Sequence, residues 1–216
     1  MAAAAGTRIL FATPHVHAPW DTYPWSDARA RQFDESFAAV QAGAAAVHVD
    51  LRRGAELFPS EVLRRDPAAF RLEGTDAVLV EFPGSWLDLP GQVELVARAC
   101  ARIEAHGLVP VLAHPERCSE VADDPLAVAS LAERGALLCL NAPSLVGGHG
   151  RVAQQVAWTL LDAGLVALVA SDGHRAPRPP AVDDAWRVVV DRVGEARARP
   201  LFDGSRLPWL ERAAAG

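Results

Sequence analysis

The chain has 216 residues, of which 50% are hydrophobic and 22% are charged, with a formal net charge of -6 at pH 7. This composition is typical of a globular protein, and the length favours a single domain over residues 1–216. The acidic balance argues against nucleic acid and anionic membrane surfaces as partners, and no apolar run is long enough for membrane insertion.

The chain has three cysteines, at positions 100, 118 and 139. Their odd number and the lack of Cys-x-x-Cys spacing argue against a disulfide framework or a zinc knuckle. None of them has an arginine at the spacing of a Cys-x5-Arg phosphatase loop. The first residues lack the basic region and the long apolar core of a signal peptide, so we expect a reducing, cytoplasmic setting.

Strand-like and helix-like segments alternate in the first half of the chain. An alanine-rich start that ends at Gly6 is typical of the last turn of a helix, and Ser26 is a typical helix N-cap. The expected elements are a helix end over residues 1–6, a strand over 7–12, a helix over 26–41, a strand over 44–50, a short helix from 59 or 60, and a strand over 77–82.

The second half continues the alternation, with Gly135 ending one helix and a glycine-rich loop following one strand. The expected elements are helices over 91–106, 124–134, 151–163, 181–193 and 208–213, strands over 109–114, 136–140 and 165–170, and loops over 141–150 and 177–180. About six strands alternating with helices predict an α/β protein with a parallel sheet.

Several apolar runs end in residue types that bind metal ions. The endings are Pro14-His15, Glu81-Phe82-Pro83, His114-Pro115-Glu116-Arg117 and Asp172-Gly173-His174. Because the carboxyl ends of parallel strands meet at one rim, these side chains are expected to converge, which favours a barrel over an open sheet. A buried structural histidine is the alternative for any single ending.

Three further segments could belong to the same rim. Glu56 follows a strand and a glycine. Residues 14–25 carry histidines among aromatics, which is compatible with a substrate mouth and equally with an apolar flap packed on the domain. Residues 141–150 could wrap phosphate through backbone N–H groups, although they lack the P-loop lysine.

These motifs, in this order from about residue 7 to 190, resemble the polymerase-and-histidinol-phosphatase (PHP) superfamily. The resemblance is strongest to the bacterial manganese-dependent tyrosine phosphatases of capsule and exopolysaccharide operons. It implies a distorted (β/α)7 TIM-like barrel with a metal centre at the carboxyl ends of the strands. The carrying motifs are Ala12-Thr13-Pro14-His15, Gly54-Ala55-Glu56-Leu57, Val80-Glu81-Phe82-Pro83, Ala113-His114-Pro115-Glu116-Arg117, residues 141–150 and Ser171-Asp172-Gly173-His174.

The resemblance also implies roles for individual residues. Arg117 would hold the phosphate and act in catalysis with His174, and His17 is a candidate substrate contact whose alternative is an exposed loop histidine. Glu81 is expected to be structural or to lie behind the ligands. Two or three Mn²⁺ ions are implied, with zinc or iron as alternatives. The implied metal ligands are His15, Glu56 as a bridging carboxylate, His114, Asp172 and His174.

The implied reaction is hydrolysis of protein phosphotyrosine by a metal-activated hydroxide, with a bacterial tyrosine kinase as a possible partner. Two alternatives are a phosphatase for a small molecule such as histidinol phosphate, and a catalytically crippled barrel that binds or regulates a partner. Substrate, metal identity and oligomeric state are left open.

The chain departs from the family pattern at its start. Family members open with a strand ending in His-x-His and a helix before the Thr-Pro-His strand, whereas this chain begins at the end of that helix. The barrel would therefore lack its first strand and helix, and an open sheet edge with an apolar groove should follow. The competing explanations are a misassigned start codon, truncation and loss of activity.

Overall fold

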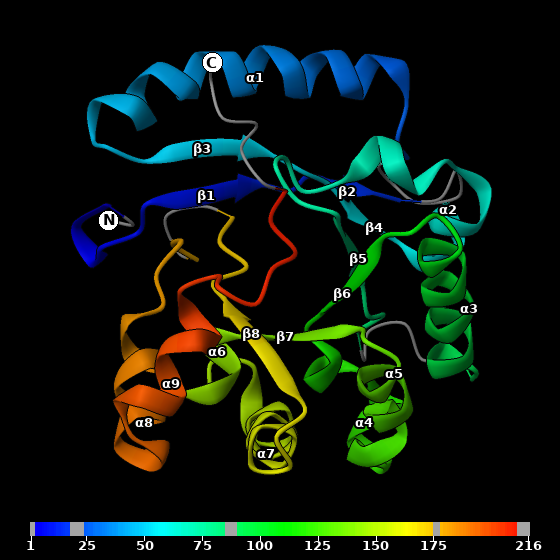
Figure 1. Ribbon diagram of the computed structural model, residues 1–216, viewed down its shortest axis with the longest axis vertical. Helices are drawn as coiled ribbons and strands as arrows, with labels where there is room; N and C mark the ends of the chain where they lie inside the picture. The colour runs from blue at the N-terminus through cyan, green and yellow to red at the C-terminus, as the bar shows by residue number, and fades with distance from the viewer. Residues whose placement is uncertain (1–2, 18–23, 85–89, 175–177, 211–216) are drawn as a thin grey trace.

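The computed structural model describes residues 3–17, 24–84, 90–174 and 178–210. Its centre is a six-stranded parallel sheet in the order β2-β4-β5-β6-β7-β8, beside a parallel pair formed by β1 and β3 (Figure 1). The strands are β1 (Ile9–Ala12), β2 (His15–Val16), β3 (Asp50–Arg53), β4 (Glu56–Leu57), β5 (Ala77–Glu81), β6 (Val109–Ala113), β7 (Leu137–Asn141) and β8 (Val166–Ala170).

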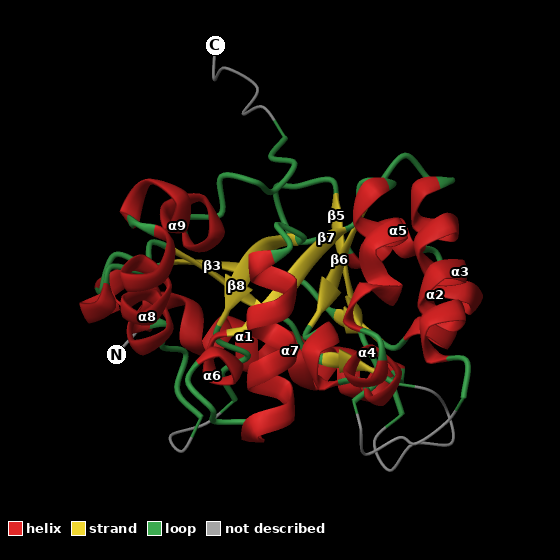
Figure 2. Cartoon of the chain, turned by 90° about the horizontal axis from the view of Figure 1, so that it is seen from below, coloured by secondary structure: helices red, strands yellow, loops and turns green. Residues whose placement is uncertain are grey.

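Helices surround the sheets, with α1 lying along β3 in Figure 1 and with α3 and α8 on opposite sides of the strands in Figure 2. The α-helices are α1 (Asp27–Ala46), α2 (Pro59–Arg64), α3 (Gln92–Glu104), α4 (Ser119–Asp123), α5 (Ala129–Glu133), α6 (Ala142–Leu145), α7 (Gly150–Asp162), α8 (Asp183–Val193) and α9 (Glu195–Phe202). Short 3-10 helices are η1 (Ala3–Ala5), η2 (Pro67–Phe70), η3 (Pro115–Arg117) and η4 (Pro125–Val128). None of the described helices is both long enough and apolar enough to cross a membrane.

The main core lies between the six-stranded sheet and its helices. Leu57, Phe82, Leu112 and Leu138, from the sheet and its edge, pack with Ile103 of α3, and all five side chains are fully buried. Burying each such side chain stabilises the fold by about 1.5–3 kcal/mol. This packing holds the strands in register, so that their carboxyl ends lie at one rim.

The long apolar strands and amphipathic helices agree with the sequence prediction. Strands β5 to β8 and helices α3 and α7 begin and end within one or two residues of their predicted bounds. Ser26 is the N-cap of α1, and its hydroxyl accepts a hydrogen bond from the backbone N–H of Arg29 at 3.3 Å. The periodicity of these segments was therefore sufficient to identify them.

Three predicted elements are wrong. The strand over 44–50 is absent because the alanine-rich stretch extends α1 to Ala46, and β3 begins only at Asp50. Much of the predicted loop over 141–150 is helical, as α6 and the start of α7. The helix over 208–213 is absent at residues 208–210, where Trp209 instead pairs with Thr75 in an isolated bridge, and the chain forms α9 earlier. Residues 211–213 lie outside the described residues.

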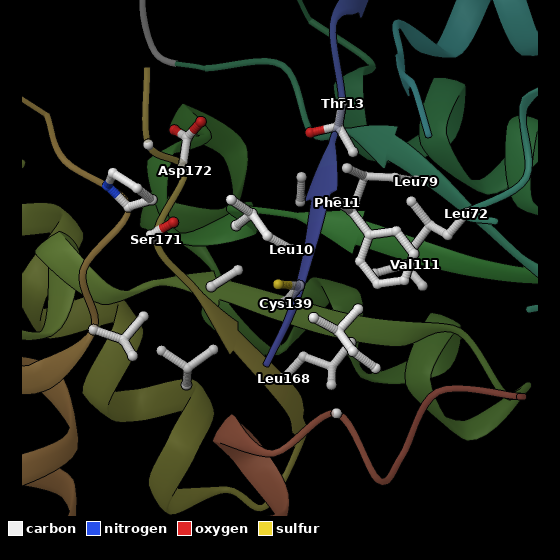
Figure 3. A pocket seen from close by; sticks show the side chains of 18 of the residues that line it. Leu10, Phe11, Thr13, Leu72, Leu79, Val111, Cys139, Leu168, Ser171 and Asp172 are labelled. Atoms are coloured by element: carbon white, nitrogen blue, oxygen red, sulfur yellow. The ribbon is translucent and has the colours of Figure 1, made fainter. Parts of the chain in front are cut away.

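The prediction is a distorted barrel that lacks its first strand and helix, and the described part of the chain forms no closed barrel. Among the described residues, no hydrogen-bonded strand joins β1 to β8, so the strands remain in two separate sheets. A pocket of 890 Å³ lies between these two strands, and its labelled side chains are mostly apolar (Figure 3). The open edge and the apolar groove that the sequence predicted are both present.

Candidate metal and phosphate site

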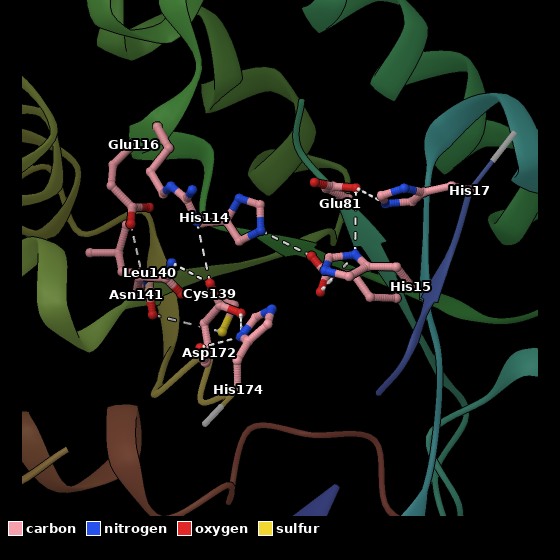
Figure 4. Close-up of polar contacts among 12 residues, drawn as sticks. His15, His17, Glu81, His114, Glu116, Cys139, Leu140, Asn141, Asp172 and His174 are labelled. Atoms are coloured by element: carbon pink, nitrogen blue, oxygen red, sulfur yellow. Dashed lines mark hydrogen bonds and ion pairs between the residues drawn. The ribbon is translucent and has the colours of Figure 1, made fainter. Parts of the chain in front are cut away.

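The site lies at the rim where the parallel strands end. Glu56 begins β4 and is in register with His15 of β2, whereas Glu81 is the last residue of β5. His114 directly follows β6, and Asp172 follows β8 by two residues. Parallel pairing carries each strand to the same edge, which is why residues far apart in the sequence converge here (Figure 4).

Two residues of the site have unusual backbone conformations. The φ angles of His114 and Asp172 are +43° and +47°, in the left-handed region that non-glycine residues rarely adopt. Each such residue costs about 1–3 kcal/mol and persists only where the surrounding structure enforces it. Strain of this kind clusters at functional sites, and here it turns both side chains at the strand ends.

Two overlapping groups of side chains could hold cations. In the first, ligand atoms of Glu56, Glu81 and His114 lie within 4.8 Å of one another, and all three residues are buried. In the second, Glu81 is joined by His15 and His17. His114 Nε2 lies 2.9 Å from Glu56 Oε1, and His15 Nδ1 lies 3.7 Å from Glu56 Oε2 and 3.8 Å from Glu81 Oε2. Glu81 therefore connects the two groups.

The chemistry of these groups fits a divalent cation. The side chains of Glu56 and Glu81 are each only 6% exposed, so their charges need compensation from nearby positive groups. The Nδ1 atoms of His15 and His114 are buried, and neither has a hydrogen-bond partner within the part of the chain that the structure describes. Buried carboxylates beside imidazole nitrogens form a mixed N/O donor set that suits manganese, zinc or iron.

Electrostatics at these groups favour positive charge. Burial opposes the ionisation of Glu81, but its hydrogen bond with His17 and the nearby histidine charges outweigh burial and lower its pKa. Burial likewise disfavours a charged His114, but its hydrogen bond with Glu56 and the neighbouring carboxylate charges raise its pKa. A group of side chains that stabilises imidazolium here would also stabilise a metal cation.

Asp172 links this negative region to a positive one. Its Oδ2 atom accepts hydrogen bonds from Asn141 Nδ2 at 3.0 Å, from Arg117 at 3.3 Å and from Arg178. Its Oδ1 atom lies 3.4 Å from Nδ1 of His174, whose ring centroid is 5.8 Å from that of His15. The donors to Oδ2 hold the carboxylate in place, and Oδ1 lies on the side of His174.

Arg178 has a free donor beside Asp172. Its Nε atom is buried and has no hydrogen-bond partner among the described residues, although its terminal nitrogen donates to Asp172. A buried guanidinium N–H without an acceptor suits an anion that arrives from outside. Together with Arg117, Arg178 therefore offers guanidinium donors that can hold an anion next to the candidate metal ligands.

All residues predicted for the site come together. His17 is not an exposed loop histidine, because its side chain is 16% exposed and its Nε2 lies 3.2 Å from Glu81 Oε2. The rest of the mouth predicted over 14–25 falls partly on residues 18–23, outside the described residues. The assembled set comprises His15, His17, Glu56, His114, Arg117, Asp172 and His174.

The sequence reasoning missed three contributors. Glu81 was expected to be structural or to lie behind the ligands, but it belongs to both candidate cation groups. Asn141 is the last residue of β7, so the same rule of strand ends could have identified it. Arg178 lies within a proline-rich loop, and no periodic pattern in the sequence marks it.

Gly173 allows the segment between Asp172 and His174 to pack closely. A Cβ atom at this position would lie 2.7 Å from the backbone of Pro180, which cannot move as a flexible side chain could. We expect Gly173→Ala to destabilise the fold by about 1–3 kcal/mol, measured by urea denaturation. The matched variant Gly43→Ala lies within α1 with no atom near the new Cβ, and should stabilise by about 0.5–1 kcal/mol. Equal effects of the two variants would contradict this packing.

Comparison with known proteins gives the family of the chain. Residues 1–205 match the family model described as capsular polysaccharide synthesis, CpsB/CapC. Tyrosine-protein phosphatase YwqE of Bacillus subtilis is 33% identical over 103 residues, which cover 48% of this chain but only 39% of YwqE. Tyrosine-protein phosphatase CpsB of Streptococcus agalactiae is 26% identical over 212 residues, covering 91% of this chain and 82% of that protein.

A solved structure supports the same relationship. Crystal structures of YwqE from Bacillus subtilis and CpsB from Streptococcus pneumoniae, described as metal-dependent tyrosine phosphatases, include a chain that superposes with a TM-score of 0.75. The identity is 25%, and the superposition covers 93% of this chain and 79% of the other. With the family match over residues 1–205 and the polar rim at the strand ends, the chain belongs to the CpsB/CapC family of capsular polysaccharide synthesis.

Proposed function

We propose that the chain is a metal-dependent phosphatase that hydrolyses protein phosphotyrosine, with a bacterial tyrosine kinase as its substrate protein. This proposal rests on the position of Asp172 between a region that suits cations and a region that is positively charged. On one side lie buried carboxylates and histidines that suit cations, and on the other lie the guanidinium groups of Arg117 and Arg178. Such an arrangement suits a phosphate held between metal ions and arginines.

The proposed metal ligands are the predicted residues with one addition. We infer that Glu81 joins them because it is shared by both candidate groups. Two or three Mn²⁺ ions are our proposal, and when bound they would lower the pKa of water and offset phosphate charge. The proposed ligands are His15, Glu56, Glu81, His114, Asp172 and His174.

Arg117, Arg178 and His174 act on the substrate, and of these three only His174 is also a proposed ligand. Arg117 and Arg178 would orient the phosphoryl group, because guanidinium binds phosphate oxygens through two parallel N–H groups. His174 has a 40% exposed side chain, and its Nδ1 lies 2.9 Å from the carbonyl oxygen of Asp172. It is therefore placed to hold or pass a proton at the mouth of the site. Hydrolysis breaks the bond between phosphorus and the tyrosine oxygen, and the leaving phenolate takes up a proton.

Two wider proposals follow. The three free, buried cysteines support a reducing cytoplasmic setting. We propose that the strands are arranged as in the distorted PHP barrel, since β1 and β8 both line one pocket.

A substrate panel tests the proposed activity. The chain would be loaded with Mn²⁺ and assayed on a phosphotyrosine peptide, a phosphoserine peptide and histidinol phosphate, with bound metal measured by elemental analysis. We expect preferential hydrolysis of the phosphotyrosine peptide and two or more ions per chain. Faster hydrolysis of histidinol phosphate would replace the protein substrate by a small molecule, and a metal-loaded chain that hydrolyses none of the three would overturn the proposal.

Glu81→Gln tests whether Glu81 is a ligand. The amide keeps the size of the side chain but removes its charge, so we expect the affinity for Mn²⁺ to fall about 10- to 100-fold, as for other groups that support a metal site. Isothermal titration with Mn²⁺ measures this. Glu94→Gln, at an exposed position in the first turn of α3, is the control. Unchanged metal affinity in Glu81→Gln would show that Glu81 is a structural residue and not a metal ligand.

A further inference from the structure

His149 is the half-buried residue that directly precedes α7, and the charges of Arg117 and Arg178 act on it. Helix α7 packs against η3, which ends at Arg117. The turn before His149 is held closely against α6, because Gly148 donates its N–H to the carbonyl of Pro143 at 2.8 Å. The position of His149 is therefore set by the fold, although the mechanism above gives it no part.

A chain of hydrogen bonds fixes the orientation of this imidazole. Glu116 Oε1 is buried and accepts the backbone N–H of Asn141 at 3.0 Å and the hydroxyl of Ser144 at 2.6 Å. Ser144 has a single hydroxyl hydrogen, which is used in that bond. With Glu116 ionised, the Ser144 oxygen, 2.9 Å from His149 Nδ1, accepts a hydrogen from the imidazole.

This geometry leaves Nε2 of His149 available to bind a ligand. With Nδ1 carrying a hydrogen, Nε2 of a neutral His149 holds a lone pair. Charged groups act on the ring from two strand ends: Arg117 and His114 after β6, and Arg178 and Asp172 after β8. Burial and the charges of the two arginines lower the pKa of His149 to about 4. The ring is thus uncharged at neutral pH, in surroundings where positive charge is in excess.

We propose that His149 is a third phosphate-binding residue, which takes up a proton from solvent at Nε2 when a tetrahedral dianion binds between Arg117 and Arg178. The arriving anion offsets the two guanidinium charges, and the new Nε2–H donates to one of its oxygens. Ser144 and Glu116 act as positioning residues that keep Nε2 as the free nitrogen. This inference deepens the proposed function, because it rests on the phosphate site between the two arginines.

Proton uptake can be measured without any hydrolysis. Sulfate is the probe, because it stays fully ionised near neutral pH and cannot itself supply or take the proton. Calorimetric titration of the metal-loaded chain in two buffers with different ionisation enthalpies gives the number of protons bound per sulfate. If the dianion returns the imidazole to its ordinary pKa of about 6.5, about half a proton should be taken up at pH 6.5.

Two variants separate His149 from the other histidines. We expect His149→Gln to lose the uptake and to bind sulfate with an affinity that no longer rises as pH falls from about 7.5 to 5.5. The exposed His106, whose Nδ1 contacts the carbonyl oxygen of Arg102, gives the control His106→Gln, with uptake as in the unaltered chain. Equal uptake in His149→Gln and the unaltered chain would overturn the proposal.

Nuclear magnetic resonance of the unaltered chain keeps the test independent of how well His149→Gln folds. Loading with Mg²⁺ in place of paramagnetic Mn²⁺ allows the imidazole signals to be followed at pH 6.5. We expect a neutral His149 with the hydrogen on Nδ1 before sulfate and an increased imidazolium fraction after it. Signals that stay unchanged while sulfate binds would assign His149 a purely structural role.

The outcomes distinguish this inference from the proposed function. Sulfate binding without proton uptake overturns the role of His149 alone and leaves the phosphatase proposal standing. Uptake without hydrolysis of any phosphomonoester overturns the phosphatase proposal alone. Absence of sulfate binding would remove the arginine site itself, and the role of His149 would fall with it.

Discussion

His114→Ala is expected to reduce phosphotyrosine hydrolysis more than about 100-fold and to lower the number of bound metal ions. His114 is 5% exposed, and its Nε2 lies 2.9 Å from Glu56. Removing the imidazole deletes a donor from a buried group that contains two carboxylates. Even residues that only support metal ligands change affinity or activity about 10- to 100-fold when mutated, so loss of a ligand should exceed that range.

Elemental analysis and initial-rate kinetics on the same preparations would measure this effect. His106→Ala removes an exposed histidine near the end of α3 and should leave both quantities unchanged. A chain that keeps its full metal content and rate with His114→Ala would exclude His114 from the ligands. Thermal denaturation of both variants separates loss of metal from loss of the fold.

Arg117→Lys is expected to lower kcat/KM for a phosphotyrosine peptide about 10²- to 10³-fold, although the positive charge is retained. A lysine offers a point charge, whereas guanidinium offers a planar pair of donors. A lower kcat/KM would therefore show that the planar arrangement of the donors matters in addition to their charge. Arg117 also donates to Asp172 at 3.3 Å, and this bond helps to hold the carboxylate. The effect should therefore fall on kcat as well as on KM.

Arg98→Lys is the matched control, since Arg98 lies on an exposed face of α3 away from the rim. A double-mutant cycle with Arg178→Lys would measure the coupling between the two guanidinium groups, because both donate to the same oxygen of Asp172. Effects of the two substitutions that simply add would show that the arginines act on the substrate independently.

Strong local patterns explain where sequence prediction succeeded. Strands β5 to β8 are short apolar runs that end in proline or polar residues, and helices α3 and α7 have a regular apolar face. Because parallel strands end at one rim, the order of strands and polar endings along the chain is enough to place His114 and Asp172 together. The family match covers residues 1–205, the range in which these motifs lie.

Weak local patterns explain the failures. Alanine-rich residues 42–46 lie before a strand, and their helix propensity extended α1 beyond its predicted end. The C-terminal residues around Trp209 were predicted helical, but backbone pairing with Thr75 and stacking of the indole on Phe11 hold them extended. The C-terminal helix prediction failed because Trp209 contacts residues that are distant in the sequence.

The sequence by itself determined the alternation of strands and helices, several of the residues that meet at the rim and the family to which they point. Only the tertiary structure decided that Glu81 joins two candidate cation groups, that Arg178 has an unpaired buried donor, and that Ser144 orients His149. The physical reason is that apolar periodicity is a property of short, continuous segments of the sequence. Hydrogen bonds, burial and charge at the rim arise from side chains that only packing brings together.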